Sequence, residues 1–417
     1  MNQQQLQRIK VVENAVEGRM SVTRAAELLQ LSPRQLKRLK QRYQSQAVDW
    51  VYHGNQGRLP ANRVSETVRR KVLELAQDRY GGFNDTHLWE KLRRIEGLAL
   101  SRQSVQRMLR KAGLASPQKR RAPKYRWRRE RRAQEGMMLL TDGSRHDWLE
   151  GRGPELTLVG FIDDATSKVP VAQFQLQHEG TAGYLRITRE VVEQIGIPLS
   201  IYRDQHGAFQ RNDAHWSVEE QLAGRQAPTQ LGRCWEELGI TSIAALSAQA
   251  KGRVERLWRT FQDRLISELR LAVATTVDQA NAVLQRFLSA YNQQFAKPAR
   301  QTGSSYRKLD SRLDLDYIFS LRYERVVNQD HTIAVGPGCK VQLPPLTALR
   351  GYAGKKVEIC QQPNGDLKVY LERRLLYTQT AEPGTAPVRA HQMRRPSGPR
   401  KKKPVRIYTY AGRPAMA

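Results

Sequence analysis

The segment MMLLTDG, residues 137–143, decides how the rest of the chain is interpreted. Four apolar side chains lead towards Asp142 and a glycine follows it, which predicts a buried strand ending at a carboxylate. The segment LSIYRDQHG, residues 199–207, repeats the pattern and carries Asp204. A carboxylate there packs poorly but suits a site at the edge of a sheet. If the two strands are neighbours, both carboxylates reach one ion.

The segment SAQAKGRVERLWRTFQDRL, residues 247–265, supplies a third carboxylate, Glu255. Its apolar residues recur at helical spacing and predict a helix packed on the sheet, namely Val254, Leu257, Trp258, Phe261 and Leu265. Three carboxylates that lie close together repel one another, so their site needs divalent cations. Oxygen ligands with open positions suit Mg²⁺ or Mn²⁺. The predicted metal ligands and catalytic residues are therefore Asp142, Asp204 and Glu255.

The three segments belong to a predicted core, residues 136–310. Residues 154–176 form the second expected strand, antiparallel to the first, and residues 199–207 form the third. A helix at 181–196 lies between the second and third strands, so the third strand crosses back beside the first. With a further helix at 276–295, the pattern predicts an α/β layer with a mixed sheet.

Charge is distributed in a way that predicts a nucleic-acid partner. The net charge is +30; residues 1–135 carry 31 Lys/Arg against 12 Asp/Glu, and residues 389–417 carry nine against none. Two basic flanks around a balanced centre favour DNA over a membrane surface, because no amphipathic anchor rich in Trp, Phe and Leu is present. Three Cys without CxxC spacing argue against structural zinc and favour a reducing compartment.

The basic N-terminal flank contains two predicted DNA-binding domains. Residues 1–48 predict a helix-turn-helix, with Ser21 and Ser32 as caps and Pro33 at a first helical position. Its second helix would enter the major groove and bring four polar side chains to the DNA: Arg34, Gln35, Lys37 and Arg38. Residues 60–116 predict a second helix-turn-helix or winged domain, with three side chains on the exposed face of its last helix: Arg102, Gln103 and Arg107. The alternative is a pair of ordinary helical bundles with basic solvated faces.

Three further regions complete the chain. Residues 117–135 form a basic linker with interleaved aromatics, from which Lys124 and Arg126 are expected to contact phosphates. Residues 318–380 predict short strands in a small β-barrel, with a hairpin turn at Asn364-Gly365. Residues 381–417 predict a basic disordered tail.

Other residues compete for, or surround, the predicted site. Asp147, Asp163 and Asp164 are alternatives for the first carboxylate, and Asp213 is an alternative for the second; Asp163 and Asp164 are more typical of turn capping. His146 and His206 follow the two aspartates and either orient water or phosphate or make local hydrogen bonds. Four cations near Glu255 are expected to surround phosphates, namely Lys251, Arg253, Arg256 and Arg259, whereas Arg264 is expected only at the surface.

The segments TDGSRHDW, FIDDATSK, YRDQHG and AQAKGRVERLWRTFQDRL resemble insertion-sequence transposases with a retroviral-integrase-like (RNase H-like) catalytic core. By position, Asp142, Asp204 and Glu255 match the family's DDE triad. The second interval is longer than usual, and the extra segment, residues 212–235, resembles an inserted helical turn. The resemblance implies a multidomain α+β protein: helix-turn-helix modules, an α/β RNase H-like core with a mixed sheet, and a C-terminal β-barrel.

The resemblance also implies a reaction. The enzyme would bind terminal inverted repeats, hydrolyse the phosphodiester at the transposon 3′ ends and join the 3′-OH to target DNA with two Mg²⁺ or Mn²⁺ ions per site. Double-stranded DNA is the expected partner, with a homo-oligomer on DNA, no membrane and no small-molecule cofactor. The expected location is cytoplasmic, with the nucleoid. The alternatives are a DNA-binding regulator with an inactive core and an RNase H-like nuclease without strand transfer.

Overall fold

The protein is represented here by a computed structural model, which describes residues 3–45, 48–51, 63–117, 122, 129–176, 179–211, 216–245, 252–336, 339–344, 351–362 and 364–380. The chain divides into two compact units, Met1–Leu73 and Glu74–Ala417. Some residues singled out in the sequence lie outside the described residues: Lys124, Arg126, Asp213, Lys251 and the basic tail, 381–417.

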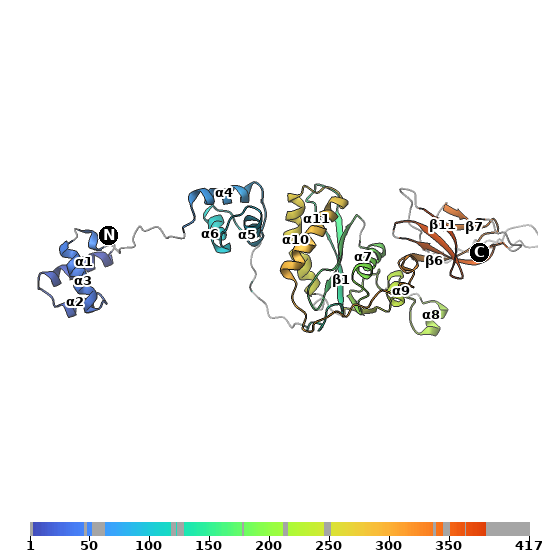
Figure 1. Ribbon diagram of the computed structural model, residues 1–417, viewed down its shortest axis with the longest axis horizontal. Helices are drawn as coiled ribbons and strands as arrows, with labels where there is room; N and C mark the ends of the chain where they lie inside the picture. Colours follow the sequence, from blue (N-terminus) through green and yellow to red (C-terminus); the bar gives the residue numbers. More distant parts are fainter. Residues whose placement is uncertain are drawn as a thin grey trace, which may run out of the picture. The chain divides into compact units, whose positions relative to one another are not determined.

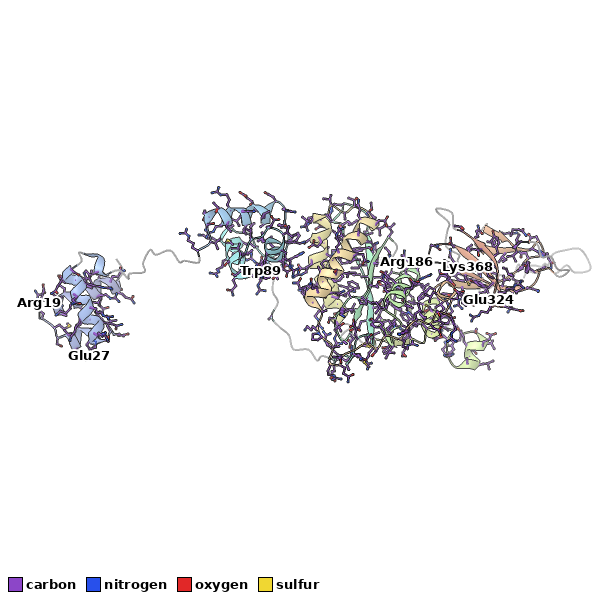
Figure 2. The ribbon with its side chains drawn as sticks, viewed as in Figure 1. Arg19, Glu27, Trp89, Arg186, Glu324 and Lys368 are labelled. Carbon is purple, nitrogen blue, oxygen red and sulfur yellow. The ribbon has the colours of Figure 1, made fainter. Side chains whose placement is uncertain are left out.

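The first unit begins with a small helical domain (Figure 1). Its elements are α1 (Gln3–Val16), α2 (Val22–Leu28), α3 (Pro33–Ser45) and the 3₁₀-helix η1 (Val48–Val51). The Ser21 side chain accepts a hydrogen bond from the Arg24 amide, and Ser32 Oγ accepts one from the Gln35 amide at 3.2 Å. These caps and Pro33 at the start of α3 confirm the two predicted helix starts. Figure 2 marks Glu27 on α2.

Three more helices follow, of which α4 (Glu66–Gln77) spans the division between the units. The others are α5 (Asp85–Arg94) and α6 (Arg102–Lys111). Asn84 Oδ1 caps α5 by accepting from the Thr86 and His87 amides, and the Ser101 side chain caps α6. The indole N–H of Trp89, labelled in Figure 2, donates to the Leu100 carbonyl at 2.7 Å and ties α5 to the segment before α6.

A five-stranded mixed sheet forms the centre of the second unit. Its strands are β1 (Leu139–His146), β2 (Leu156–Asp163), β3 (Ala172–Gln175), β4 (Ser200–Arg203) and β5 (Thr241–Ala244), in the order β3-β2-β1-β4-β5. β1, β2 and β3 pair antiparallel, whereas β1–β4 and β4–β5 are parallel. The predicted mixed sheet and the neighbouring first and third strands are therefore confirmed, but β1 continues past Asp142 to His146 instead of ending at that carboxylate.

Two details of the sheet differ from the prediction. The single strand expected at 154–176 is two strands, because Asp163 accepts from the Thr166 amide at 2.7 Å and closes a turn between them. The extra segment before Glu255 is more than one helical turn, since it includes α8 (Val218–Ala223) and most of α9 (Gln230–Glu237). β5 follows these helices and was not predicted; its four residues carry too short an apolar pattern.

Helices cover both faces of the sheet (Figure 1). On one face, α10 (Gly252–Leu271) and α11 (Val277–Phe295) share a buried cluster with Leu140 and Leu158. On the other face, α7 (Thr181–Gln194) and α9 share a second cluster with Leu139 and Phe161. In the parts of the chain that are described, no helix is both long and apolar enough to cross a membrane.

The C-terminal region consists of α12 (Leu315–Ile318) and six strands: β6 (Leu321–Val326), β7 (Thr332–Gly336), β8 (Cys339–Gln342), β9 (Lys356–Gln361), β10 (Leu367–Leu371) and β11 (Arg374–Gln379). They form a four-stranded sheet, β11-β10-β9-β6, and a β7–β8 ribbon. Among the described strands no pairing closes the predicted barrel. The predicted turn at Asn364-Gly365 joins β9 to β10, and Gly365 has a φ of 98° that suits glycine.

Buried ion pairs attach α5 to α10. Arg264, expected at the surface, is only 8 % exposed, and its guanidinium donates to both carboxylate oxygens of Glu90, at 2.7 and 3.2 Å. Glu268 accepts from Lys91 at 2.8 Å and pairs with His87 at 2.7 Å. Burial alone would raise the pKa of Glu90, but the hydrogen bond and charge of Arg264 outweigh it and lower that pKa. The expectation for Arg264 is therefore wrong, because its partner lies far away in the sequence.

Replacing Glu90 with Ala should destabilise the second unit strongly. The change leaves the Arg264 guanidinium buried without its carboxylate, which typically costs about 3–5 kcal/mol. Urea unfolding of the full chain, followed by tryptophan fluorescence, measures the loss. Glu155→Ala is the matched control, because its pair with Arg145 is solvent-exposed on both sides and such pairs contribute at most about 1 kcal/mol. Equal effects of the two variants would contradict the structural role of the buried pair.

Candidate active site

Asp142 and Asp204 lie at the same level on neighbouring strands. β1 and β4 pair in parallel, with Leu139 opposite Ile201 and Leu140 opposite Tyr202. Continued by two residues, this register sets Asp142 opposite Asp204, which directly follows the end of β4. Residues two apart on a strand share a face, so the two carboxylates lie on the face of Leu140 and Tyr202. The pairing therefore supports the predicted proximity of Asp142 and Asp204, whose joint metal binding stays a prediction.

The face that carries the two aspartates is the one that α10 covers. Leu140, two residues before Asp142, packs in one cluster with residues of α10 that include Trp258. Ser144, two residues after Asp142, accepts a hydrogen bond at Oγ from Gln262 of α10 at 3.2 Å. Asp142 therefore projects from β1 towards the side of α10, and both Asp142 and Asp204 are half-buried.

Glu255 lies in the first turn of α10 and is exposed. Its neighbours Val254 and Leu257 are buried against the sheet and fix the rotation of the helix. Within the described ranges, no three His, Cys, Asp or Glu side chains lie close enough to hold one metal ion. The structure therefore places Glu255 on the helix that covers the two aspartates, but it does not gather all three carboxylates around a common point.

The alternative aspartates are engaged elsewhere. Asp163 accepts from Thr166 Oγ1 at 2.7 Å and from the Gly136 amide at 2.9 Å, so it caps the turn after β2. Asp164 is fully buried and makes ion pairs with Arg129 and Arg253. Asp147 is exposed and accepts from the Gly151 amide at 3.1 Å. These contacts give each described alternative a local structural role.

The Asp164 carboxylate joins the end of the basic linker to the first turn of α10. It accepts from the Arg129 guanidinium at 2.6 Å and from the Arg132 amide at 2.7 Å. The Arg253 guanidinium donates to the same carboxylate and, at 2.6 Å, to the Arg129 carbonyl. Arg253 therefore ties the first turn of α10 to the linker, which is a structural role; contact with phosphate stays a prediction.

Sequence reasoning missed a fourth acidic side chain near the two aspartates. Glu179, just before α7, accepts a hydrogen bond from the buried Tyr184 hydroxyl. Burial raises the pKa of Glu179, and the negative charges of Asp142 and Asp204 raise it further, against the hydrogen bond from Tyr184 and the charge of His206. An isolated Glu before a helix gives no signal in the sequence. The one related feature is Gly143, because the Glu179 carboxylate occupies the space that a side chain at position 143 would fill.

The two histidines make local contacts. The His206 amide donates to Asp204 Oδ1 at 2.9 Å, and His206 Nδ1 accepts from the Ala208 amide at 3.3 Å. The His146 ring lies 5.6 Å from the ring of Trp148, centroid to centroid. Local interactions therefore account for the positions of both rings.

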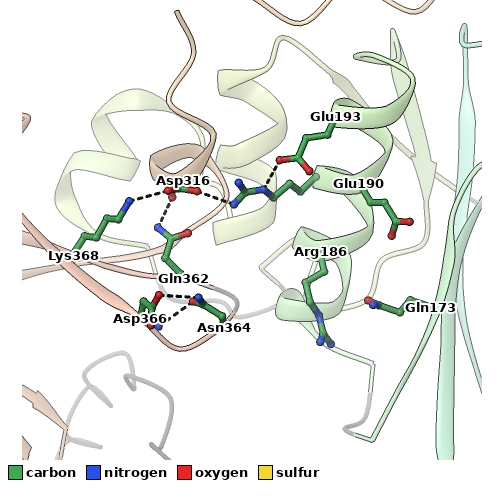
Figure 3. Close-up of a pocket in the computed structure, with 10 residues that line it drawn as sticks. Gln173, Arg186, Glu190, Glu193, Asp316, Gln362, Asn364, Asp366 and Lys368 are labelled. Atoms are coloured by element: carbon green, nitrogen blue, oxygen red, sulfur yellow. Dashed lines mark hydrogen bonds and ion pairs between the residues drawn. The ribbon is translucent and has the colours of Figure 1, made fainter. Parts of the chain in front are cut away.

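A separate pocket of about 570 Å³ lies between α7 and the C-terminal sheet (Figure 3). Arg186, Arg189 and Glu190 of α7 line one side of it. Asp316, on the opposite side, accepts from Lys368 at 2.8 Å and pairs with Arg189 at 3.0 Å. None of the three predicted catalytic carboxylates lines the pocket. Its ion pairs join two parts of the second unit.

The chain is similar to two curated transposases along most of its length. It is 35 % identical over 370 residues to the putative transposase y4bF of Sinorhizobium fredii, across 88 % of this chain and 79 % of that protein. This chain belongs to the insertion-sequence transposases. It is also 26 % identical over 404 residues to the transposase for insertion sequence IS1202 of Streptococcus pneumoniae, across 88 % of this chain and 84 % of that protein.

A helix-turn-helix domain family matches residues 7–58 of this transposase, in line with a DNA-binding N-terminus. Among solved structures, the catalytic core domain of BIV integrase matches with 15 % identity, 42 % of this chain, 90 % of that chain and a TM-score of 0.27. A simian T-cell lymphotropic virus intasome chain matches with 13 % identity, 71 % of this chain, 91 % of that chain and a TM-score of 0.31. At such TM-scores neither likeness supports a conclusion.

The transposase presents most of its described candidate DNA-binding residues to solvent. Nine of the predicted side chains are exposed: Arg34, Gln35, Lys37, Arg38, Arg102, Gln103, Arg107, Arg256 and Arg259. Arg253 is the exception, because it pairs with Asp164. The first four lie on α3, which follows α2 within the matched domain and would be the second helix of the predicted helix-turn-helix, the one that enters a major groove in such domains. Contact of each side chain with DNA stays a prediction.

Removing the charge of Asp164 should lower the stability of the fold and spare Mn²⁺ binding, whereas removing the charge of Asp204 should spare stability and abolish Mn²⁺ binding. Asp164→Asn leaves two arginines without their buried carboxylate, so the transposase should lose about 3 kcal/mol of unfolding free energy while it still binds Mn²⁺. Asp204→Asn should keep the stability and lose Mn²⁺ binding. Urea unfolding and calorimetric Mn²⁺ titration of the full chain measure the two effects. If Asp164→Asn abolished Mn²⁺ binding in a folded chain and Asp204→Asn did not, the assignment of these aspartates would be reversed.

Proposed function

We propose that this transposase binds the terminal inverted repeats of its insertion sequence, cleaves the DNA at the transposon 3′ ends and joins those ends to target DNA. The observation that carries the proposal is the parallel pairing of β1 with β4, with Leu140 opposite Tyr202, because the same register continued by two residues would set Asp142 opposite Asp204 on the side of α10. Glu255, on that helix, is the third proposed catalytic carboxylate. Membership of the transposase family supports the same reaction.

The residues around the two aspartates fit divalent cations. Carboxylate oxygens are the donors that Mg²⁺ and Mn²⁺ prefer, and the effect of Asp142 and Asp204 on the pKa of Glu179 indicates concentrated negative charge. Asp142, Asp204 and Glu255 would hold the ions.

When bound, two such ions supply an activated attacking oxygen and stabilisation of the departing one. In the first reaction a water attacks the phosphorus at the transposon end, and the bond from phosphorus to the 3′ oxygen breaks to give a free 3′-OH. In the second, that 3′-OH attacks a target phosphodiester, so one P–O bond forms as another breaks and no covalent protein–DNA intermediate is needed. The protein has to align the reacting oxygens and exclude other geometries.

Cationic side chains divide the task of holding the DNA. The exposed face of α3 carries Arg34 and Arg38, which we assign to end recognition with Gln35 and Lys37. Arg256 and Arg259 follow Glu255 on the exposed side of α10 and would bind phosphates beside the reacting bond. Two transposon ends have to be joined, so we propose that the transposase acts as a homo-oligomer on DNA.

Neutralising a proposed catalytic carboxylate should separate binding from cleavage. Asp204→Asn and Glu255→Gln should retain binding to a labelled transposon end and lose cleavage by more than about a hundredfold, because several kcal/mol of charge stabilisation are removed. A strand-transfer assay with Mg²⁺ and a target plasmid measures both steps, with Glu193→Gln on α7 as the exposed control. Normal cleavage by either variant would overturn the assigned site. A wild-type chain that binds without cutting would be a regulator, and one that cuts without joining a nuclease.

Replacing two arginines on α3 should change the salt dependence of end binding. Each phosphate contact contributes about 0.9 to the slope of log affinity against log salt. Arg34→Ala and Arg38→Ala should therefore lower that slope by about one unit each, as measured by fluorescence anisotropy on an end duplex. Lys10→Ala, an exposed cation on α1, is the control and should leave the slope unchanged. An unchanged slope in both arginine variants would show that neither arginine contacts a phosphate of the end duplex.

A further inference from the structure

We propose that Glu179 is a positioning residue of the proposed catalytic site, where its fixed negative charge strengthens divalent-cation binding by Asp142 and Asp204. The inference rests on the proposed function. Glu179 is not a member of the predicted triad, and no three-residue metal group occurs among the described residues. Its role is therefore to set the field at the aspartates rather than to act as an established ligand.

Close packing brings the Glu179 carboxylate to β1. A Cβ atom built on Gly143 would lie 2.5 Å from Glu179 Oε2 and 2.7 Å from its Cδ. Real Cβ atoms essentially never approach other heavy atoms so closely, so the carboxylate occupies the space that a side chain at 143 would fill. Gly143 directly follows Asp142 in β1. Because successive side chains of a strand alternate, Gly143 faces the side of α7 and Asp142 the side of α10, so the Glu179 carboxylate lies against the β1 backbone one residue from Asp142.

Two features hold the carboxylate in this position. Tyr184, one turn into α7, is fully buried and donates its hydroxyl hydrogen bond to Glu179. Glu179 also precedes the N-terminus of α7, where a helix favours negative charge. The α7 cap residue is Gly180, which makes no side-chain cap bond. Glu179 is therefore oriented by a buried tyrosine.

The electrostatic interactions link Glu179 to the proposed site rather than to a cation elsewhere in the chain. Apart from burial and Tyr184, the groups that act on its pKa are His206, Asp142 and Asp204. Because the charges of Asp142 and Asp204 act on Glu179, a divalent cation at the two aspartates would also be attracted by the Glu179 carboxylate. Residues that surround metal ligands commonly change metal affinity in this way.

Glu179→Gln tests the inference, because glutamine keeps an acceptor for Tyr184 and removes only the charge. The Mn²⁺ dissociation constant of the full chain, measured by calorimetry, should rise about tenfold, as for other groups that support metal ligands. Tyr184→Phe should weaken Mn²⁺ binding in the same direction by less, and Glu179→Asp should restore part of the affinity. A purely structural Glu179 would instead lower the unfolding temperature and leave the Mn²⁺ affinity unchanged.

The control variants separate this inference from the proposed function. Glu190→Gln is matched, because Glu190 lies on α7, burial raises its pKa, and it lines the separate pocket of Figure 3. It should bind Mn²⁺ like the wild type. Suppose that Asp204→Asn loses Mn²⁺ binding, whereas Glu179→Gln and Tyr184→Phe bind Mn²⁺ as tightly as the control Glu190→Gln. The role of Glu179 is then overturned, and the proposed site stands. If Asp204→Asn binds Mn²⁺ normally, the proposed site itself is overturned.

Discussion

The parallel pairing of β1 with β4 is the constraint on which the rest of the site depends. Leu139 and Ile201 face the cluster with α7 and α9, whereas Leu140 and Tyr202 face the side of α10. Because side chains alternate along a strand, a slip by one residue would exchange these faces and bury the wrong set. The hydrophobic register that stabilises the sheet therefore also determines where Asp142 lies relative to Asp204. In the proposed site, the same pairing would serve both stability and chemistry.

Acidic side chains serve two different purposes in the core. Asp164 and Glu90 are buried, and arginines within the chain neutralise them, as buried charges require. Burial raises the pKa of Glu179 instead, and the like charges of Asp142 and Asp204 raise it further. The first group has its counter-ions built in, whereas the second concentrates one sign of charge at the place where DNA phosphates would approach in the proposed function. Divalent cations would resolve that conflict, because they neutralise both partners.

Local patterns predicted the parts of the fold whose causes are local. Ser21, Ser32 and Pro33 begin helices as expected, and apolar runs ending in Asp142 and Asp204 form neighbouring strands. Contacts between residues far apart in the sequence could not be predicted from local patterns. Arg264 looked like a surface cation because Glu90 lies on a distant helix, and Glu179 went unnoticed because its partners Gly143 and Tyr184 meet it only in the folded chain. β5, with four residues, was too short for periodicity to show.

Two ion pairs that anchor α10 limit how Glu255 could reach Asp142 and Asp204 in the proposed site. Arg253 holds its first turn to Asp164, and Arg264 holds a later turn to Glu90 of α5. Glu255 lies between these two points on a helix that rises about 1.5 Å per residue, so its backbone has little freedom to move independently of the helix. A shift of the whole helix would carry α5 along or break buried ion pairs. Bringing Glu255 to the aspartates by a change of its own side-chain conformation is therefore less costly than moving the helix, since the exposed side chain can rotate without disturbing either anchor.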